Sequence, residues 1–81
     1  MGEMDQSSGQ LASIAWPLIE HGQTIGLRWD IEQDGRLLGH VERRHGADRL
    51  EVYDSEGRRL GHTWSIGRAV NMIEGRAEAC G

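Results

Sequence analysis

Two copies of an acid-glycine turn constrain the fold of this chain more than any other feature. The first lies in Asp34-Gly35-Arg36-Leu37-Leu38-Gly39-His40, and the second follows in Glu56-Gly57-Arg58-Arg59-Leu60-Gly61-His62. Alternating apolar residues precede each copy. Because glycine adopts positive φ at no steric cost, an acid-glycine pair between two alternating runs predicts a β-hairpin. Two such hairpins in series predict an antiparallel sheet.

Burial selects the register of the first predicted hairpin. A three-residue loop over 33–35 places Ile31 opposite Leu37 and Trp29 opposite Gly39, which keeps one face apolar. A two-residue loop would instead place Glu32 opposite Leu37. We therefore expect the three-residue loop. The same test pairs Val41 with Leu50 and Val52 with Leu60, and the predicted inner face comprises Leu27, Trp29, Ile31, Leu37, Gly39, Val41, Leu50, Val52 and Leu60.

The two ends of the chain differ in pattern. Ser65 is a suitable N-cap for a helix whose apolar stripe is Ile66, Ala69, Val70, Ile73 and Ala77. Near the N-terminus, helical spacing joins Leu11, Ile14, Ala15, Leu18 and Ile19, but Pro17 interrupts it. A short helix ending near Trp16 is favoured, and an extended segment on a sheet edge is the alternative.

The sequence therefore predicts an α+β fold. Its parts are a four-stranded antiparallel β-meander over about residues 25–63, a helix over about 65–78 packed on one face, and a short N-terminal element. Residues 1–10 are expected to form a flexible tail, and residues 11–81 a single domain.

Composition narrows the function classes. All nine basic residues are arginine, an abundance typical of a GC-rich genome, and the net charge of −4 argues against nucleic-acid or anionic-membrane binding. No apolar run approaches the roughly 18 residues of a membrane span. The single cysteine, Cys80, permits no internal disulfide. The acidic N-terminus does not resemble a signal peptide, so we expect a cytoplasmic protein.

The four histidines do not form a predicted metal site. Each of His40 and His62 follows a Leu-Gly pair, but the derived register places His40 on the outer face and His62 on the inner face, opposite Leu50. They therefore do not converge on one ion, and no metal or other cofactor is expected. Glu20-His21 and the pair His40 and Glu42 could supply acid-base chemistry, but no residue is marked as a nucleophile. We expect a protein that is not an enzyme.

The predicted outer face of the sheet suggests one alternative. Over about residues 25–78 the layout resembles the small sheet DNA-binding domains of phage-type integrases and plant AP2 factors. The resemblance implies that this face lies in the DNA major groove. However, the arginines of this face are matched by an equal number of carboxylates, a pattern suited to solvent and cross-strand pairing. The arginines are Arg28, Arg36, Arg49 and Arg59, and the carboxylates are Asp30, Glu32, Glu42 and Glu51.

An apolar pair interrupts that face. The derived register places Leu38 beside Tyr53 at its centre, and the N-terminal segment, which includes Trp16 and Leu18, needs a surface to cover. That segment either folds over Leu38 and Tyr53 or joins another chain. We therefore expect a non-catalytic binding module that contacts a protein partner or forms a homodimer. The candidate contact residues are Leu38, Tyr53, Trp16, Leu18, Arg28, Arg36, Arg49 and Arg59. The alternative function is a small nucleic-acid-binding regulator.

Overall fold

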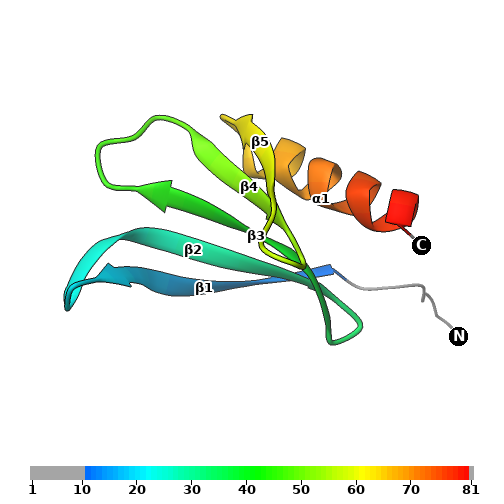
Figure 1. Ribbon diagram of the computed structural model, residues 1–81, viewed down its shortest axis with the longest axis horizontal. Coiled ribbons are helices and arrows are strands. Elements are labelled where there is room, and N and C mark those ends of the chain that lie inside the picture. The colour runs from blue at the N-terminus through cyan, green and yellow to red at the C-terminus, as the bar shows by residue number, and fades with distance from the viewer. Residues whose placement is uncertain (1–10, 81) are drawn as a thin grey trace, which may run out of the picture.

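The protein forms one antiparallel sheet with a C-terminal helix on part of one face (Figure 1). This computed structural model describes residues 11–80, so the predicted tail over residues 1–10 lies outside the described residues. The strands follow one another in the sheet in chain order. The elements are β1 (Leu11–Glu20), β2 (Gln23–Gln33), β3 (Arg36–Arg44), β4 (Leu50–Asp54), β5 (Arg59–Thr63) and α1 (Ile66–Cys80).

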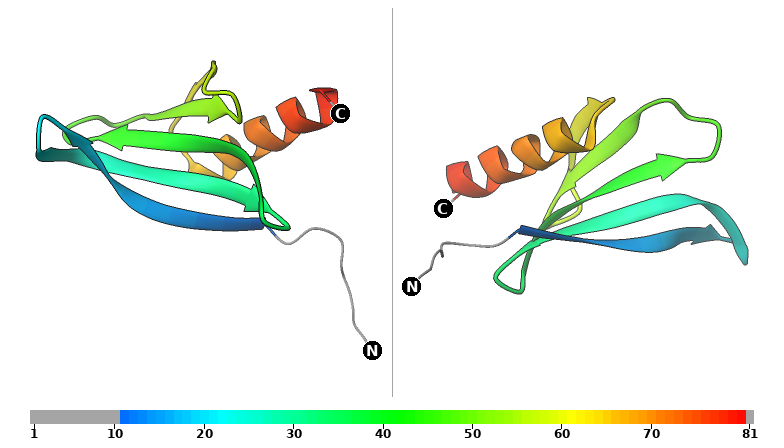
Figure 2. Two further views of the ribbon diagram at one scale, coloured as in Figure 1. Left: turned by 60° about the horizontal axis from the view of Figure 1, so that its bottom comes forward. Right: turned by 180° about the vertical axis from the view of Figure 1, so that it is seen from behind.

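The helix covers only part of the sheet. Its main contacts are with β3, β4 and β5, and both views of Figure 2 show β1 and β2 extending away from it. Ala69 and Ile73 supply its buried side chains, and the Ala69 N–H donates to the Ser65 carbonyl at 3.0 Å, which closes the first turn. The buried core lies between α1 and the sheet and consists of Ile31, Leu38, Val41, Leu50, Val52, Ala69 and Ile73.

Two tight turns connect the first three strands. His21 and Gly22, with φ of 51° and 77°, join β1 to β2. Asp34 and Gly35, with φ of 54° and 80°, join β2 to β3. Positive φ at both central residues matches the right-handed twist of the flanking strands and defines the compact two-residue hairpin turn. The predicted hairpin at Asp34-Gly35 is confirmed, but its loop is one residue shorter than predicted.

The predicted antiparallel meander with a C-terminal helix on one face is confirmed, whereas the predicted count of four strands is wrong. The additional strand is β1, which pairs with β2 from Leu11 opposite Gln33 to Glu20 opposite Gln23. The favoured N-terminal helix does not form. Pro17 is compatible with an edge strand, where its missing N–H faces away from the sheet, but it would remove a hydrogen bond inside a helix.

A bulge in the β2–β3 pairing reverses three predicted side-chain orientations. Ile31 pairs with Gly39 and Glu32 with Leu37, so Leu38 is the extra residue on β3. An extra residue shifts the alternation of side chains between the two faces. Leu38, predicted on the outer face, is therefore buried in the core with 5% of its surface exposed. Arg36 likewise lies on the helix side, and Leu37, predicted inside, is exposed.

The same shift changes what covers Gly39. Trp29 was predicted opposite this glycine, but it pairs with Val41. A Cβ at Gly39 would lie 3.1 Å from the Ile73 side chain and would collide with the Tyr53 carbonyl oxygen. Gly39 is thus a point of close approach between α1 and the sheet.

The later registers also differ by small shifts from the predicted ones. Val41 pairs with Val52, where Leu50 was predicted, because the loop between β3 and β4 is longer than expected. Val52 pairs with Gly61, and Leu60 becomes the extra residue. Past this second bulge, His62 is opposite Glu51. His62 is therefore exposed on the outer face, and its predicted inner position opposite Leu50 is wrong.

Candidate interaction surface

Strand β1 exposes large apolar side chains along its whole length. Between 39% and 56% of the surface of each of four residues is accessible: Leu11, Ile14, Trp16 and Ile19. Leu18 is half-buried. Monomeric soluble proteins rarely expose contiguous apolar patches of this kind, and larger ones mark interaction sites. We call residues 11–19 the β1 surface.

The β1 surface has two faces and, within residues 11–80, a free edge, because none of the described strands pairs with β1 on the side away from β2. Ala15 pairs with Trp29 and therefore shares the helix side of the sheet, together with Ser13 and Pro17. Ile14 and Trp16 alternate with these residues and lie on the outer face. In an edge strand, proline directs its missing N–H toward the free edge. The backbone groups of Ala15 and Ser13, which alternate with those bonded to β2, point toward the same edge.

The N-terminal segment does not cover the outer face. It was predicted to fold over Leu38 and Tyr53 or to join another chain, and β1 instead extends the sheet beside β2. The predicted Leu38–Tyr53 patch does not exist, because Leu38 lies in the core and Tyr53 lies on the outer face.

Tyr53 is integrated into the polar outer face. Its ring stacks on that of His40, with centroids 4.5 Å apart and planes at 12°. The His40 Nε2 atom lies 3.2 Å from Glu42 Oε2. Burial lowers the pKa of His40, and the positive charge of Arg28 lowers it further. Burial also raises the pKa of Tyr53. Both shifts favour the neutral forms of the two rings, which stack as a packed pair.

Carboxylates pair with most of the predicted outer-face arginines. Arg28 Nε donates to Asp30 Oδ1 at 2.8 Å. Glu51 accepts from Arg49 Nε at 2.9 Å and from Arg59 Nε at 2.7 Å. The hydrogen bond from Arg59 is the main reason why the pKa of Glu51 is lowered. The fourth arginine, Arg36, lines a hollow on the helix side with Glu74 and Glu78, so the four do not form one surface.

A hollow lies beside α1 where the helix leaves the sheet uncovered. It has a volume of about 380 Å³ and is lined by Trp29, Leu50, Trp64 and Ile66, with Arg43 and Asp48 at its rim. Leu27 is exposed on the same face. Apolar surface therefore continues from the β1 surface to the start of α1.

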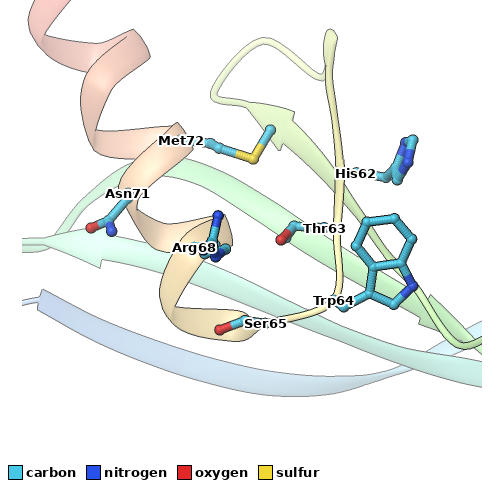
Figure 3. A pocket seen from close by; sticks show the side chains of 7 residues that line it. All are labelled: His62, Thr63, Trp64, Ser65, Arg68, Asn71 and Met72. Atoms are coloured by element: carbon cyan, nitrogen blue, oxygen red, sulfur yellow. The ribbon is translucent and has the colours of Figure 1, made fainter.

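A second hollow, of about 540 Å³, lies on the other side of Trp64 (Figure 3). Trp64 is 69% exposed, and its ring meets that of His62 edge to face at 5.3 Å. Arg68, Asn71 and Met72 of α1 complete the lining. His62 Nδ1 lies 3.4 Å from an Arg59 nitrogen, and no hydrogen bond joins His62 to Ser65 or Thr63 among the described contacts.

The described part of the chain contains neither a cluster of metal-ligand residues nor a helix that could span a membrane. Within residues 11–80, no group of three or more His, Cys, Asp or Glu side chains could hold a metal ion. The described helix, α1, is neither long enough nor apolar enough to cross a membrane.

The sequence prediction named Trp16 and Leu18 as candidate contact residues, but it did not name several other apolar residues that are exposed. Ile14 and Ile19 were assigned to a helix face, and Leu27 and Ile66 to the core, because apolar spacing does not reveal where the covering layer ends. Trp64 carried one available signal: it falls between the last predicted strand and the N-cap, outside both apolar patterns.

The fold and this surface define a small α+β protein, an antiparallel five-stranded meander with one C-terminal helix. No protein-family model, curated protein or solved structure matches this chain.

Proposed function

We propose that this protein is a small non-catalytic interaction module that binds another protein chain through the β1 surface. The observation that carries the proposal is the exposure of four large apolar side chains on one edge strand. Burying apolar surface contributes about 25 cal/mol per Å². A partner strand or surface on β1 would remove this area from water, as in other complexes that extend an exposed sheet edge.

Site-specific photo-crosslinking in cells that produce the protein tests this proposal. A photoreactive phenylalanine analogue at Trp16 is expected to crosslink to protein, because this side chain is half exposed on the β1 surface. The matched control places the same analogue at Arg58, an exposed residue of the β4–β5 turn. Crosslinks from position 58 but not from position 16 would contradict the proposal.

The nucleic-acid alternative has less support. Binding driven by phosphate contacts requires cations that are free to replace counterions. Arg28, Arg49 and Arg59 are each held by a carboxylate on the same face. We expect only weak binding to random duplex DNA at 150 mM salt, with a shallow dependence on salt concentration. Glu51→Gln, which releases two of these arginines, is the sensitised control and is expected to bind more tightly.

A further inference from the structure

The free edge of β1 lacks most of the features that prevent strands from pairing between molecules. Natural edge strands are usually short, charged, bulged or covered. Residues 11–19 contain no charged side chain, and ten residues of strand border the solvent. Glu20, at the end of the strand, is held by Arg44 at 3.1 Å. Pro17 interrupts the row of donors on this edge, and the β1–β2 register shifts once, between Leu18 and Ile19 near the end of the strand.

We propose that the partner of the β1 surface is a second copy of the same chain, paired antiparallel along β1 about a two-fold axis at Ala15. The inference rests on the proposed function and names its partner. Residues 11–19 are centred on Ala15, so this register overlaps the whole uncharged segment with itself. It forms one continuous ten-stranded sheet, because rotation about an axis perpendicular to the sheet keeps each face on its own side. Both helices then lie on the same face.

The side chains are self-complementary in this register. Ile14 lies opposite Trp16 of the second copy on the outer face, and aromatic residues pair favourably with β-branched ones across strands. Ala12 lies opposite Leu18, and on the helix side Leu11 lies opposite Ile19. Each large side chain thus meets an apolar one. The two Glu20 carboxylates lie at opposite ends, so the pairing brings no like charges together.

The exposed side chains of β1 supply a substantial part of the area that a dimer needs. Four of them are each about half exposed, namely Leu11, Ile14, Trp16 and Ile19. At roughly 200 Å² for a fully exposed large side chain, they present on the order of 400 Å² of apolar surface per copy. The pairing also covers the backbone of β1, and a standard interface buries about 800 Å² per partner. Pairing along the edge uses both faces of β1 at once, which a layer on one face could not do.

The absence of Pro17's donor limits the pairing but does not prevent it. In this register Pro17 lies opposite Ser13 of the second copy, so one hydrogen bond is missing on each side of the axis. The central pair, Ala15 with its own counterpart, retains both bonds. Once the pair forms, each β1 is bonded on both sides, so pairing along this edge ends at two copies.

Disulfide trapping tests the pairing and its register. In a Cys80→Ser background, Ala15→Cys places two thiols directly opposite one another, at the roughly 5.5 Å Cα separation that a disulfide spans. We expect Ala15→Cys to form a covalent dimer on mild oxidation. The control, Ser55→Cys in the exposed β4–β5 turn, is expected to form no covalent dimer. Trapping at position 55 but not at position 15 would overturn the proposal.

Sedimentation equilibrium provides the second measurement. The unmodified protein is expected to sediment as a dimer at micromolar concentration, and Trp16→Asp to weaken dimerisation at least about 100-fold. Far-ultraviolet circular dichroism of the variant checks that the monomer remains folded. A wild-type protein that sediments as a monomer would overturn the dimer. If Trp16 nevertheless crosslinks to other proteins, the proposed function stands with a different partner. If Trp16 forms no crosslink to any protein, both the proposed function and the proposed dimer are overturned.

Discussion

The half of the sheet beneath α1 and the half formed by β1 and β2 differ in how far their apolar side chains are buried. Strand β3 has only three large apolar residues, and two of them, Leu38 and Val41, are in the core. Strand β1 is apolar along nearly its whole length, and most of its side chains are exposed. Burial here depends on the second layer, since α1 packs mainly on β3, β4 and β5.

This contrast separates two uses of apolar side chains. Beneath α1 they stabilise the monomer, and on β1 they remain available to a partner. An isolated two-stranded hairpin is marginally stable in water, so β1 and β2 depend on the rest of the sheet for their conformation. Substitutions that compare the same residue type in the two halves measure the difference directly.

The largest expected difference is between two isoleucines. Ile73 is fully buried between α1 and the sheet, and Ile73→Ala is expected to lower the free energy of unfolding by about 3 to 4 kcal/mol. Ile14→Ala, on the exposed β1 surface, is expected to lower it by less than about 1 kcal/mol. Urea titrations at low protein concentration, where self-association does not contribute, measure both. Equal losses would show that β1 is part of the monomer core.

A smaller effect is expected from closing the tight contact between α1 and the sheet. The added methyl group of Gly39→Ala would press against Ile73 and the Tyr53 carbonyl, and we expect a loss of about 1 to 3 kcal/mol. The matched control is Gly75→Ala, where nothing lies within 4 Å of the added Cβ. That variant is expected to gain up to about 1 kcal/mol, because alanine favours a helix. Thermal melting compares the two, and a neutral Gly39→Ala would contradict the close approach.

The smallest effect concerns the outer-face ion pairs. Glu51→Gln removes the carboxylate shared by Arg49 and Arg59, and we expect a loss of about 0.5 to 1 kcal/mol at low salt. Because the pKa of Glu51 is lowered in the folded protein, its contribution is present above the ordinary pKa of glutamate and is lost as the pH falls below it. The wild type and the variant are therefore expected to converge in stability once the pH falls below the lowered pKa of Glu51 in the folded protein.

The control for this comparison is Glu56→Gln. Glu56 pairs with Arg58 at 3.0 Å in an exposed turn, where solvent screens the interaction, so no measurable loss is expected. A difference between wild type and Glu51→Gln that persists unchanged in acid would show that the effect does not arise from the charge.

Much of the fold was predictable from local chemistry. The turn at Asp34-Gly35 and the alternation of Trp29 and Ile31 are properties of neighbouring residues, and they predicted the meander. The bulge at Leu38 was not predictable in this way. Leu37 and Leu38 are the same residue type, so their order carries no signal of which one enters the core. The choice depends on combining a two-residue turn with a bulge, and α1 favours that combination by packing on Gly39.

The interaction surface was less predictable. Trp16 and Leu18 were identified as surplus apolar residues, but their spacing also suits a helix, and pairing with β2 decides between the two. The predicted partnership of Leu38 with Tyr53 failed because one bulge moved Leu38 to the other face. Whether Leu27 is covered depends on how far α1 extends across the sheet, which no local pattern encodes.

The sequential strand order has a consequence for synthesis on the ribosome. Each strand pairs only with its neighbours in the chain, so every pairing closes a short loop, a topology that favours rapid folding among β-rich proteins. Among the described elements, the apolar strand β1 nevertheless emerges before the others, and α1, which completes the core, emerges after them. Until α1 is made, β1 has only β2 as a partner, and neighbouring nascent chains on one messenger present the same free edge. Assembly between chains during translation would therefore compete with completion of the monomer.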